Sequence, residues 1–263
     1  VLVTKFDLNI KGVAYGTLFS ALITSIIFLI YMFWYLSKYT KITINFAQIF
    51  NLKKIKNIFN INLNIFIRTI LLTFSFLWFT YLGTQIGEDY VAANAILINL
   101  VFLSAFILDA YAFSTEGIVG YSLGKKDLNL FKNIVKNSFI LSSISGLIIS
   151  IIFFFTNNLV INLMSNIDEI RKLSSSYVVW LIILPVISSF CYQFDGIFIG
   201  ASQTKELRNA MIFSVFSYLL ISILLIKFLF NTGIWISLCI FMILRAISLF
   251  YYLDKIYLRF RKN

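Results

Sequence analysis

The chain consists mainly of long apolar stretches that almost lack charged side chains. Seven of these stretches reach the ~20 residues that an α-helix needs to cross a bilayer. A composition of 60% hydrophobic and only 13% charged residues leaves too little polar surface to cover a soluble globule. The sequence therefore predicts an all-α polytopic membrane protein with about seven transmembrane helices. Their predicted bounds are about 12–36, 63–86, 91–121, 137–157, 174–200, 209–229 and 232–253.

Basic residues are distributed unevenly between the predicted loops. Alternate loops, including the C-terminus, hold fifteen lysines and arginines, whereas the opposite loops hold five. The positive-inside rule then predicts a multi-pass protein of the inner (plasma) membrane with a cytoplasmic C-terminus. The net charge of +11 is thereby explained by topology, and we expect no nucleic-acid partner. Residues 43–59 alternate apolar side chains with lysines and are predicted to lie along the cytoplasmic interface.

Five ionisable side chains interrupt the apolar stretches: Arg68, Asp109, Glu116, Asp195 and Arg245. Each costs roughly 2.5 to 3.5 kcal/mol at a bilayer centre, so such groups persist where they face a partner or a wet cavity. Asp109 lies seven residues before Glu116 on one predicted helix, so both project from one stripe. Counted from the predicted helix ends, all five lie in the cytoplasmic half of the membrane. We expect each acid to have a guanidinium nearby, with Asp109 closest to a cavity.

Two interpretations of these charges remain open. They can form a structural network that locks the helices together, which is the simpler reading for Arg68 and Arg245. Alternatively, three carboxylates facing two guanidinium groups leave one acid incompletely paired and able to exchange a proton. Asp195, Asp109 and Glu116 are therefore the ion-coupling candidates, with Asp195 leading, and the sequence does not decide among them.

Several kinds of chemistry are missing from the sequence. The chain has no histidine, and Cys191 and Cys239 stand alone in separate apolar stretches, so we expect neither a metal site nor a cofactor. No glycine-rich phosphate loop is present, and we expect no enzymatic activity. Pro185, the one proline, lies inside a predicted helix and is a hinge candidate. Aromatic residues near the charges can line a pocket or pack between helices: Phe76, Trp78, Phe79, Tyr81, Tyr192 and Phe194.

Three segments carry a family resemblance. The run FIRTILLTFSFLWFTYLGTQIGEDYVAANAILINLVFLSAFILDAYAFSTEGIVGYSLGKKD resembles the seventh and eighth helices of multidrug and toxic compound extrusion (MATE) transporters. The match is to the branch of DNA-damage-inducible protein F (DinF). LPVISSFCYQFDGIFIGASQTKELRNAMIFS resembles the tenth helix of that branch, and ILRAIS resembles the twelfth. KGVAYGTLFSALIT is similar to the sixth helix, so the chain resembles helices 6 to 12 of a twelve-helix transporter.

The resemblance implies an antiporter that exports drugs or toxic organic compounds in exchange for protons or sodium ions. Its partners are then the bilayer, a small cationic or amphipathic substrate and a missing N-terminal lobe. It divides the chain into the last helix of that lobe (1–36), a cytoplasmic linker (37–61) and a six-helix C-terminal lobe (62–263). The chain reads as a fragment. It has Asp195 where other branches carry a coupling aspartate, but Arg68 near the position of their coupling glutamate.

Two alternative functions stay open at the level of sequence. A lipid or glycan flippase of the same superfamily would need a larger and more cationic cavity than these few charges indicate. An integral-membrane transferase would need acids or histidines at an interfacial active site, and the absence of histidine weighs against it.

Overall fold

The computed structural model describes residues 9–39 and 51–261, and within them every regular element is a helix. The predicted all-α membrane fold is confirmed, because six of these helices are long and apolar enough to cross a bilayer. The elements are α1 (Asn9–Tyr39), α3 (Leu52–Thr84), α4 (Glu88–Lys125), α5 (Leu128–Met164), α6 (Asp168–Ser176), α7 (Val178–Gly200) and α8 (Thr204–Arg261).

The chain divides into two units, Val1–Lys56 and Asn57–Asn263. The first unit contains α1, one uninterrupted helix of 31 residues. Most of the predicted interfacial segment, residues 43–50, lies outside the described residues. Its remainder forms the first turns of α3, which begins at Leu52 inside the predicted linker 37–61.

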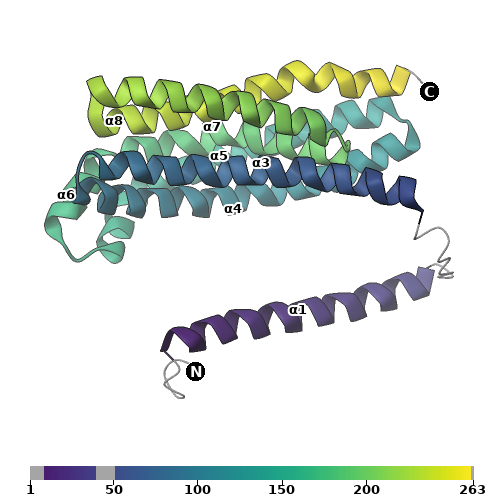
Figure 1. Cartoon of the computed structure of the whole chain (residues 1–263), viewed down its shortest axis with the longest axis horizontal. Helices are drawn as coiled ribbons and strands as arrows, with labels where there is room; N and C mark the ends of the chain where they lie inside the picture. Colours follow the sequence, from purple (N-terminus) through teal and green to yellow (C-terminus); the bar gives the residue numbers. More distant parts are fainter. Residues whose placement is uncertain (1–8, 40–50, 262–263) are drawn as a thin grey trace. The chain divides into compact units, whose positions relative to one another are not determined.

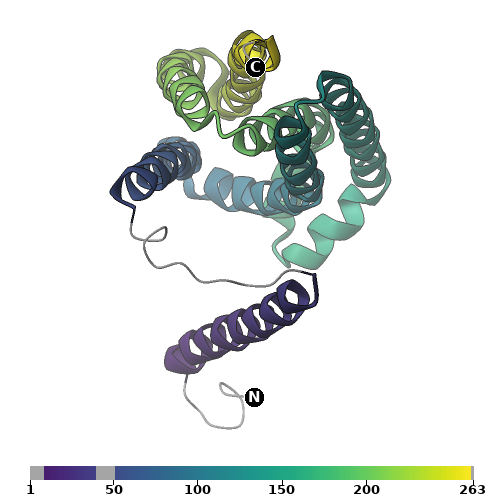
Figure 2. The ribbon, with the colours of Figure 1, turned by 90° about the vertical axis from the view of Figure 1, so that its right-hand side faces the viewer.

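The second unit is a bundle whose long helices run roughly side by side (Figure 1) and are seen nearly end-on in Figure 2. Its last helix, α8, reverses direction at Phe230, where φ is 46° and ψ is −131°. The two arms then run antiparallel, because the Tyr218 and Phe241 rings meet at 5.2 Å and Lys255 Nζ lies 3.1 Å from Glu206 Oε1. The predicted spans 209–229 and 232–253 are therefore the two arms of α8.

The predicted span 174–200 begins too early. Residues 174–176 belong to α6, a separate short helix that opens with Asp168 and Glu169, and Tyr177 separates it from α7. The Arg171 side chain fixes this turn: Nε donates to the Ser165 carbonyl oxygen at 2.6 Å, and Nη1 pairs with Asp168 at 3.2 Å. These charged residues place α6 at one end of the bundle, and α7 is correspondingly shorter (Figure 1).

Helix α7 lies at the centre of the bundle and packs on α4, α5 and α8. Its contact with α4 depends on two glycines four residues apart. A Cβ at Gly196 would collide with the Ala112 backbone, and one at Gly200 would collide with the Glu116 backbone. Small residues at this spacing let two membrane helices approach to backbone contact. The charged residues on α4 and α7 are thereby held at a fixed register.

Basic side chains gather at the end of the bundle where α3 begins, α4 turns into α5, α7 turns into α8 and the C-terminus lies (Figure 1). The opposite end, where α3 turns into α4 and α6 lies, holds the acidic residues Glu88, Asp89, Asp168 and Glu169. The charge asymmetry expected from the loops is thus a property of the folded bundle.

The close contact between α4 and α7 leads to a first prediction. Gly200→Ala places a methyl group against the Glu116 backbone and should destabilise the bundle by about 1 to 3 kcal/mol. Gly124→Ala is the matched control, because nothing lies within 4 Å of its Cβ. It should be neutral or stabilise α4. Thermal unfolding of the detergent-solubilised variants measures both, and equal melting temperatures would contradict the proposed packing.

Candidate functional site

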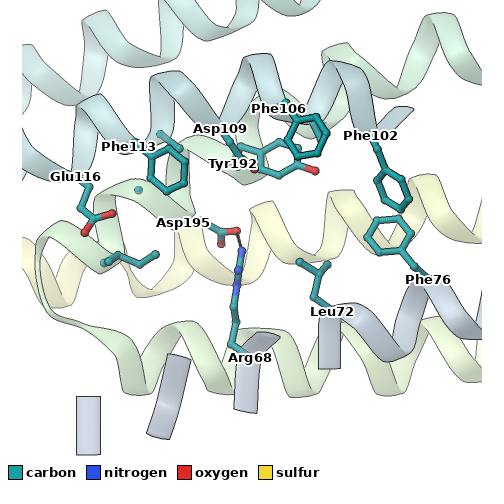
Figure 3. A pocket seen from close by; sticks show the side chains of 14 residues that line it. Arg68, Leu72, Phe76, Phe102, Phe106, Asp109, Phe113, Glu116, Tyr192 and Asp195 are labelled. Carbon is teal, nitrogen blue, oxygen red and sulfur yellow. Dashed lines mark hydrogen bonds and ion pairs between the residues drawn. The ribbon is translucent and has the colours of Figure 1, made fainter. Parts of the chain in front are cut away.

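A pocket of about 250 Å³ opens between α3, α4 and α7 (Figure 3). Four of the five charged residues singled out in the sequence line it: Arg68, Asp109, Glu116 and Asp195. The rest of the wall is mainly apolar and aromatic, with Leu72, Phe76, Phe102, Phe106, Phe113, Tyr192 and Ile199. The charges of three separate helices therefore converge on one cavity.

The carboxylate of Asp195 forms ion pairs with the guanidinium groups of both Arg68 and Arg245. Arg68 from α3 and Arg245 from the second arm of α8 each donate to Oδ2, the latter at 2.7 Å. Asp195 is only 4% exposed, and within the described part of the chain its Oδ1 has no hydrogen-bond partner. Because a carboxylate without a countercharge is strongly disfavoured in an apolar interior, these ion pairs are what make its burial tolerable.

The two arginines have different surroundings. Arg245 is 1% exposed, its guanidinium carbon lies 5.5 Å from the centre of the Phe241 ring, and Nη1 lies 3.4 Å from Met242 Sδ. It does not line the pocket. Arg68 lines the pocket, and its side chain is 15% exposed. Figure 3 shows it reaching from α3 across the cavity to Asp195. Arg245 is thus fixed in the core, whereas Arg68 forms part of the cavity wall.

Asp109 and Glu116 both face the pocket from α4, as their common stripe predicts (Figure 3). Neither forms an ion pair or a hydrogen bond with any side chain in residues 9–39 and 51–261. The prediction that each acid has a guanidinium nearby is met by a direct ion pair at Asp195, whereas Asp109 and Glu116 form no such pair in the described residues. Central α7 presents Asp195 to α3 and α8 at once, so one acid takes both arginines and the α4 acids keep none.

Sequence reasoning missed several buried polar contacts that hold the bundle. The Asn94 and Asn231 side chains exchange two hydrogen bonds at 2.6 and 3.1 Å, and Trp235 Nε1 donates to Asn94 Oδ1 at 2.9 Å. This cluster ties α4 to α8 beside the reversal at Phe230. Thr115 Oγ1 similarly meets Gln193 Oε1 at 2.9 Å. Asparagine and glutamine inside apolar stretches are the signal that could have found them.

The singled-out aromatic residues divide between the pocket and the core. Phe76 and Tyr192 line the pocket. Phe79 packs edge-on against Trp235 at 4.9 Å, and Trp78 Nε1 donates to Ser222 at 2.9 Å. Phe194 faces a separate apolar groove between α5, α7 and α8. Two of the six are therefore placed to contact a molecule beside Asp195.

Pro185 lies within α7, which remains helical around it. Proline cannot donate the hydrogen bond of an ordinary helical residue, and nearby hydroxyl groups often compensate. The carbonyl left without its helical donor is that of Leu181, and at the next residue the Ser150 hydroxyl on α5 donates to the Ile182 carbonyl oxygen at 2.6 Å. Gly146 of α5 also approaches the Pro185 carbonyl so closely that a Cβ there would lie 2.9 Å from it. The turn of α7 around Pro185 is therefore covered by α5.

The described residues contain no group of three or more histidine, cysteine, aspartate or glutamate side chains arranged to hold a metal ion. The thiols of Cys191 and Cys239 are buried in the core of the bundle. The chemistry available at the pocket is therefore that of carboxylates, guanidinium groups and aromatic rings.

Comparison with known proteins identifies relatives. The model of the MatE family matches residues 65–227, which is more than half of the chain. The chain is 32% identical over 189 residues to DNA damage-inducible protein F of Escherichia coli (strain K12), covering 72% of this chain and 41% of that protein. It is 24% identical over 185 residues to Protein DETOXIFICATION 43 of Arabidopsis thaliana, covering 69% and 34%. The chain thus spans less than half the length of these curated relatives.

Solved structures share the fold. One is the outward-facing conformation of a multidrug resistance MATE family transporter of the MOP superfamily, with a TM-score of 0.85 and 17% identity over 100% of this chain and 59% of that one. Another is MATE in complex with MaL6, with a TM-score of 0.86 and 16% identity over 100% of this chain and 60% of that one. At these identities the likeness concerns the fold.

The buried ion pair leads to a second prediction. Arg245→Met leaves Asp195 with Arg68 alone and should destabilise the bundle by about 3 to 5 kcal/mol, as removal of one partner of a buried pair does. Adding Asp195→Asn removes the carboxylate that has lost its buried partner and should recover part of that loss, with Arg68 then left to the cavity. Melting temperature and membrane abundance report both effects. A double variant as unstable as Arg245→Met would show that Arg245 acts through packing and not through charge.

Proposed function

Since the chain belongs to the MatE family, we propose that it forms part of a secondary active antiporter that exports drugs or other toxic organic compounds in exchange for protons or sodium ions. The single observation that carries this proposal is the pocket inside the bundle, where two acids without ion-pair partners in the described chain face a cavity walled by aromatic rings. The solved relative of the same fold is described as a multidrug resistance transporter. The chain spans less than half the length of its curated relatives, and this activity is proposed for a protein that includes these residues.

The pocket chemistry favours a cationic or amphipathic organic substrate. Unpaired carboxylates attract a cation, and aromatic rings bind organic cations through their faces. Asp109 and Glu116 supply the first feature; Phe76, Phe106 and Phe113 supply the second. A substrate of this class can occupy the cavity without displacing an existing ion pair.

Coupling to protons or sodium ions is assigned to the same acids. Asp195, Asp109 and Glu116 are the candidates, and the geometry favours Asp109 and Glu116 because Asp195 already has two countercharges. We assign Arg68 and Arg245 to the charge network around Asp195. A group that exchanges an ion during transport must be reachable from the cavity, and both α4 acids line it.

The arrangement in the membrane is proposed on the same basis. The basic end of the bundle is placed at the cytoplasmic face, which puts the C-terminus in the cytoplasm. Residues 62–263 then form a C-terminal lobe, 37–61 a linker and 1–36 the last helix of a partner lobe.

The test of this function is ion-driven efflux of a fluorescent organic cation from cells that express the native gene product. Asp109→Asn and Glu116→Gln keep the size of each side chain but remove its charge, so we expect normal abundance with at least about a tenfold loss of efflux. Asp195→Asn should instead lower abundance, because it leaves two buried guanidinium groups unpaired. Parent-like efflux by both α4 variants would refute the assignment.

Pro185 is proposed to act as a hinge within α7. Pro185→Ala restores a backbone donor inside α7 and should stiffen the helix there, so we expect unchanged or higher thermal stability with slower transport. Ile187→Ala, two residues further along the helix, is the control for a change in side-chain size alone. Transport at the parent rate in Pro185→Ala would show that Pro185 does not act as a hinge.

A further inference from the structure

The charges around the pocket separate into a neutral buried pair and a group that faces the cavity. Asp195 and Arg245 are both nearly inaccessible and are joined at 2.7 Å, so their charges cancel within the core. Asp195 also borders the cavity, and the other charged residues on the wall are Arg68, which pairs with Asp195 as well, and the acids Asp109 and Glu116. With all three ionised, the cavity carries one net negative charge from these side chains.

Arg68 is the second of two cations that pair with Asp195. Arg245 already compensates Asp195, and its contacts with Phe241 and Met242 hold it in place. The buried residues of α3, by contrast, all lie beyond Arg68 towards its C-terminal end, and comprise Ser75, Phe79, Leu82 and Gly83. The first half of α3 thus has no fully buried residue among those described, and Asp195 keeps Arg245 as its countercharge when Arg68 is replaced.

We propose that Arg68 sets the charge class of the substrate, restricting the pocket to monovalent organic cations. This inference rests on the proposed transport function and goes beyond it. A fixed guanidinium on the wall cancels one of the two α4 carboxylates, so a monovalent ligand neutralises the cavity. A divalent ligand leaves an uncompensated positive charge in a low-dielectric site, which is unfavourable.

The alternative is a purely structural role, in which Arg68 only links α3 to α7. That role predicts that its replacement changes stability and lowers the binding of every ligand alike. The charge role predicts that replacement changes the ratio of affinities for ligands of different charge. The ratio of the affinities for two ligands therefore separates the two explanations. A contribution to affinity that is the same for both ligands cancels in this ratio.

Ethidium and propidium are suitable probes, because they share one aromatic ring system and carry one and two positive charges. We expect the purified native protein to bind ethidium more tightly. Arg68→Gln should shift the affinity ratio towards propidium by at least about tenfold, as removal of one nearby charge would. Arg68→Lys should keep the parent ratio. Lys132→Gln removes an exposed positive charge from α5, outside the pocket, and should also keep it.

Charge compensation supplies a second, independent readout. Asp109→Asn leaves a cavity with no net charge and should weaken ethidium binding, whereas adding Arg68→Gln restores one negative charge and should restore binding. This rescue tests the charge role with ethidium alone, without a comparison between two dyes. A parent-like ratio in folded Arg68→Gln, or absence of rescue in the double variant, overturns the inference. Failure of the parent to bind either dye instead counts against the proposed function.

Discussion

The burial of one carboxylate, Asp195, is the constraint on which the site depends. An isolated charge in this position would oppose folding, so the bundle must deliver a guanidinium to it from another helix. Arg245 does so from the second arm of α8, and Arg68 does so from α3. The arms of α8 can reach this position only because the chain reverses at Phe230, beside the amides of Asn94 and Asn231. The reversal of α8 at Phe230 is therefore needed for the ion pair between Arg245 and Asp195.

Two kinds of interface surround the pocket. Between α4 and α7 the backbones touch, because Gly196 and Gly200 leave no side chain between them. Helix α3, in contrast, meets the other described helices through side chains, such as Asn64 with Arg208 at 2.9 Å and Trp78 with Ser222 at 2.9 Å. A backbone contact resists sliding, whereas long polar side chains can change partners without loss of a packed core. The acids of α4 are thus held rigidly, and Arg68 stands on the more adjustable wall.

The sequence predicts the parts of this arrangement that depend on composition and period. Apolar length gives the membrane helices, and a spacing of seven residues places Asp109 and Glu116 on one face. Which arginine meets which acid depends on how α3, α7 and α8 are arranged in space, and no local pattern encodes that. The boundary between α6 and α7 is missed because an apolar run does not show where a helix is interrupted. The glycine pair in GIFIG was visible, but its partner Ala112 belongs to a helix distant in sequence.

The charge of the cavity has a consequence for how transport can be coupled. If Arg68 cancels one α4 carboxylate, one proton on the other brings the cavity to zero, and so does one monovalent substrate. Proton and substrate then exclude each other, because binding both would leave a net positive charge in a low-dielectric site. Mutual exclusion at one site is sufficient for exchange of one ion for one substrate, provided that the cavity opens alternately to the two sides. Without Arg68 the same cavity would hold two negative charges and accept proton and substrate together. Under the proposed function, the positive charge of Arg68 on the wall is what makes proton and substrate compete for a pair of acids.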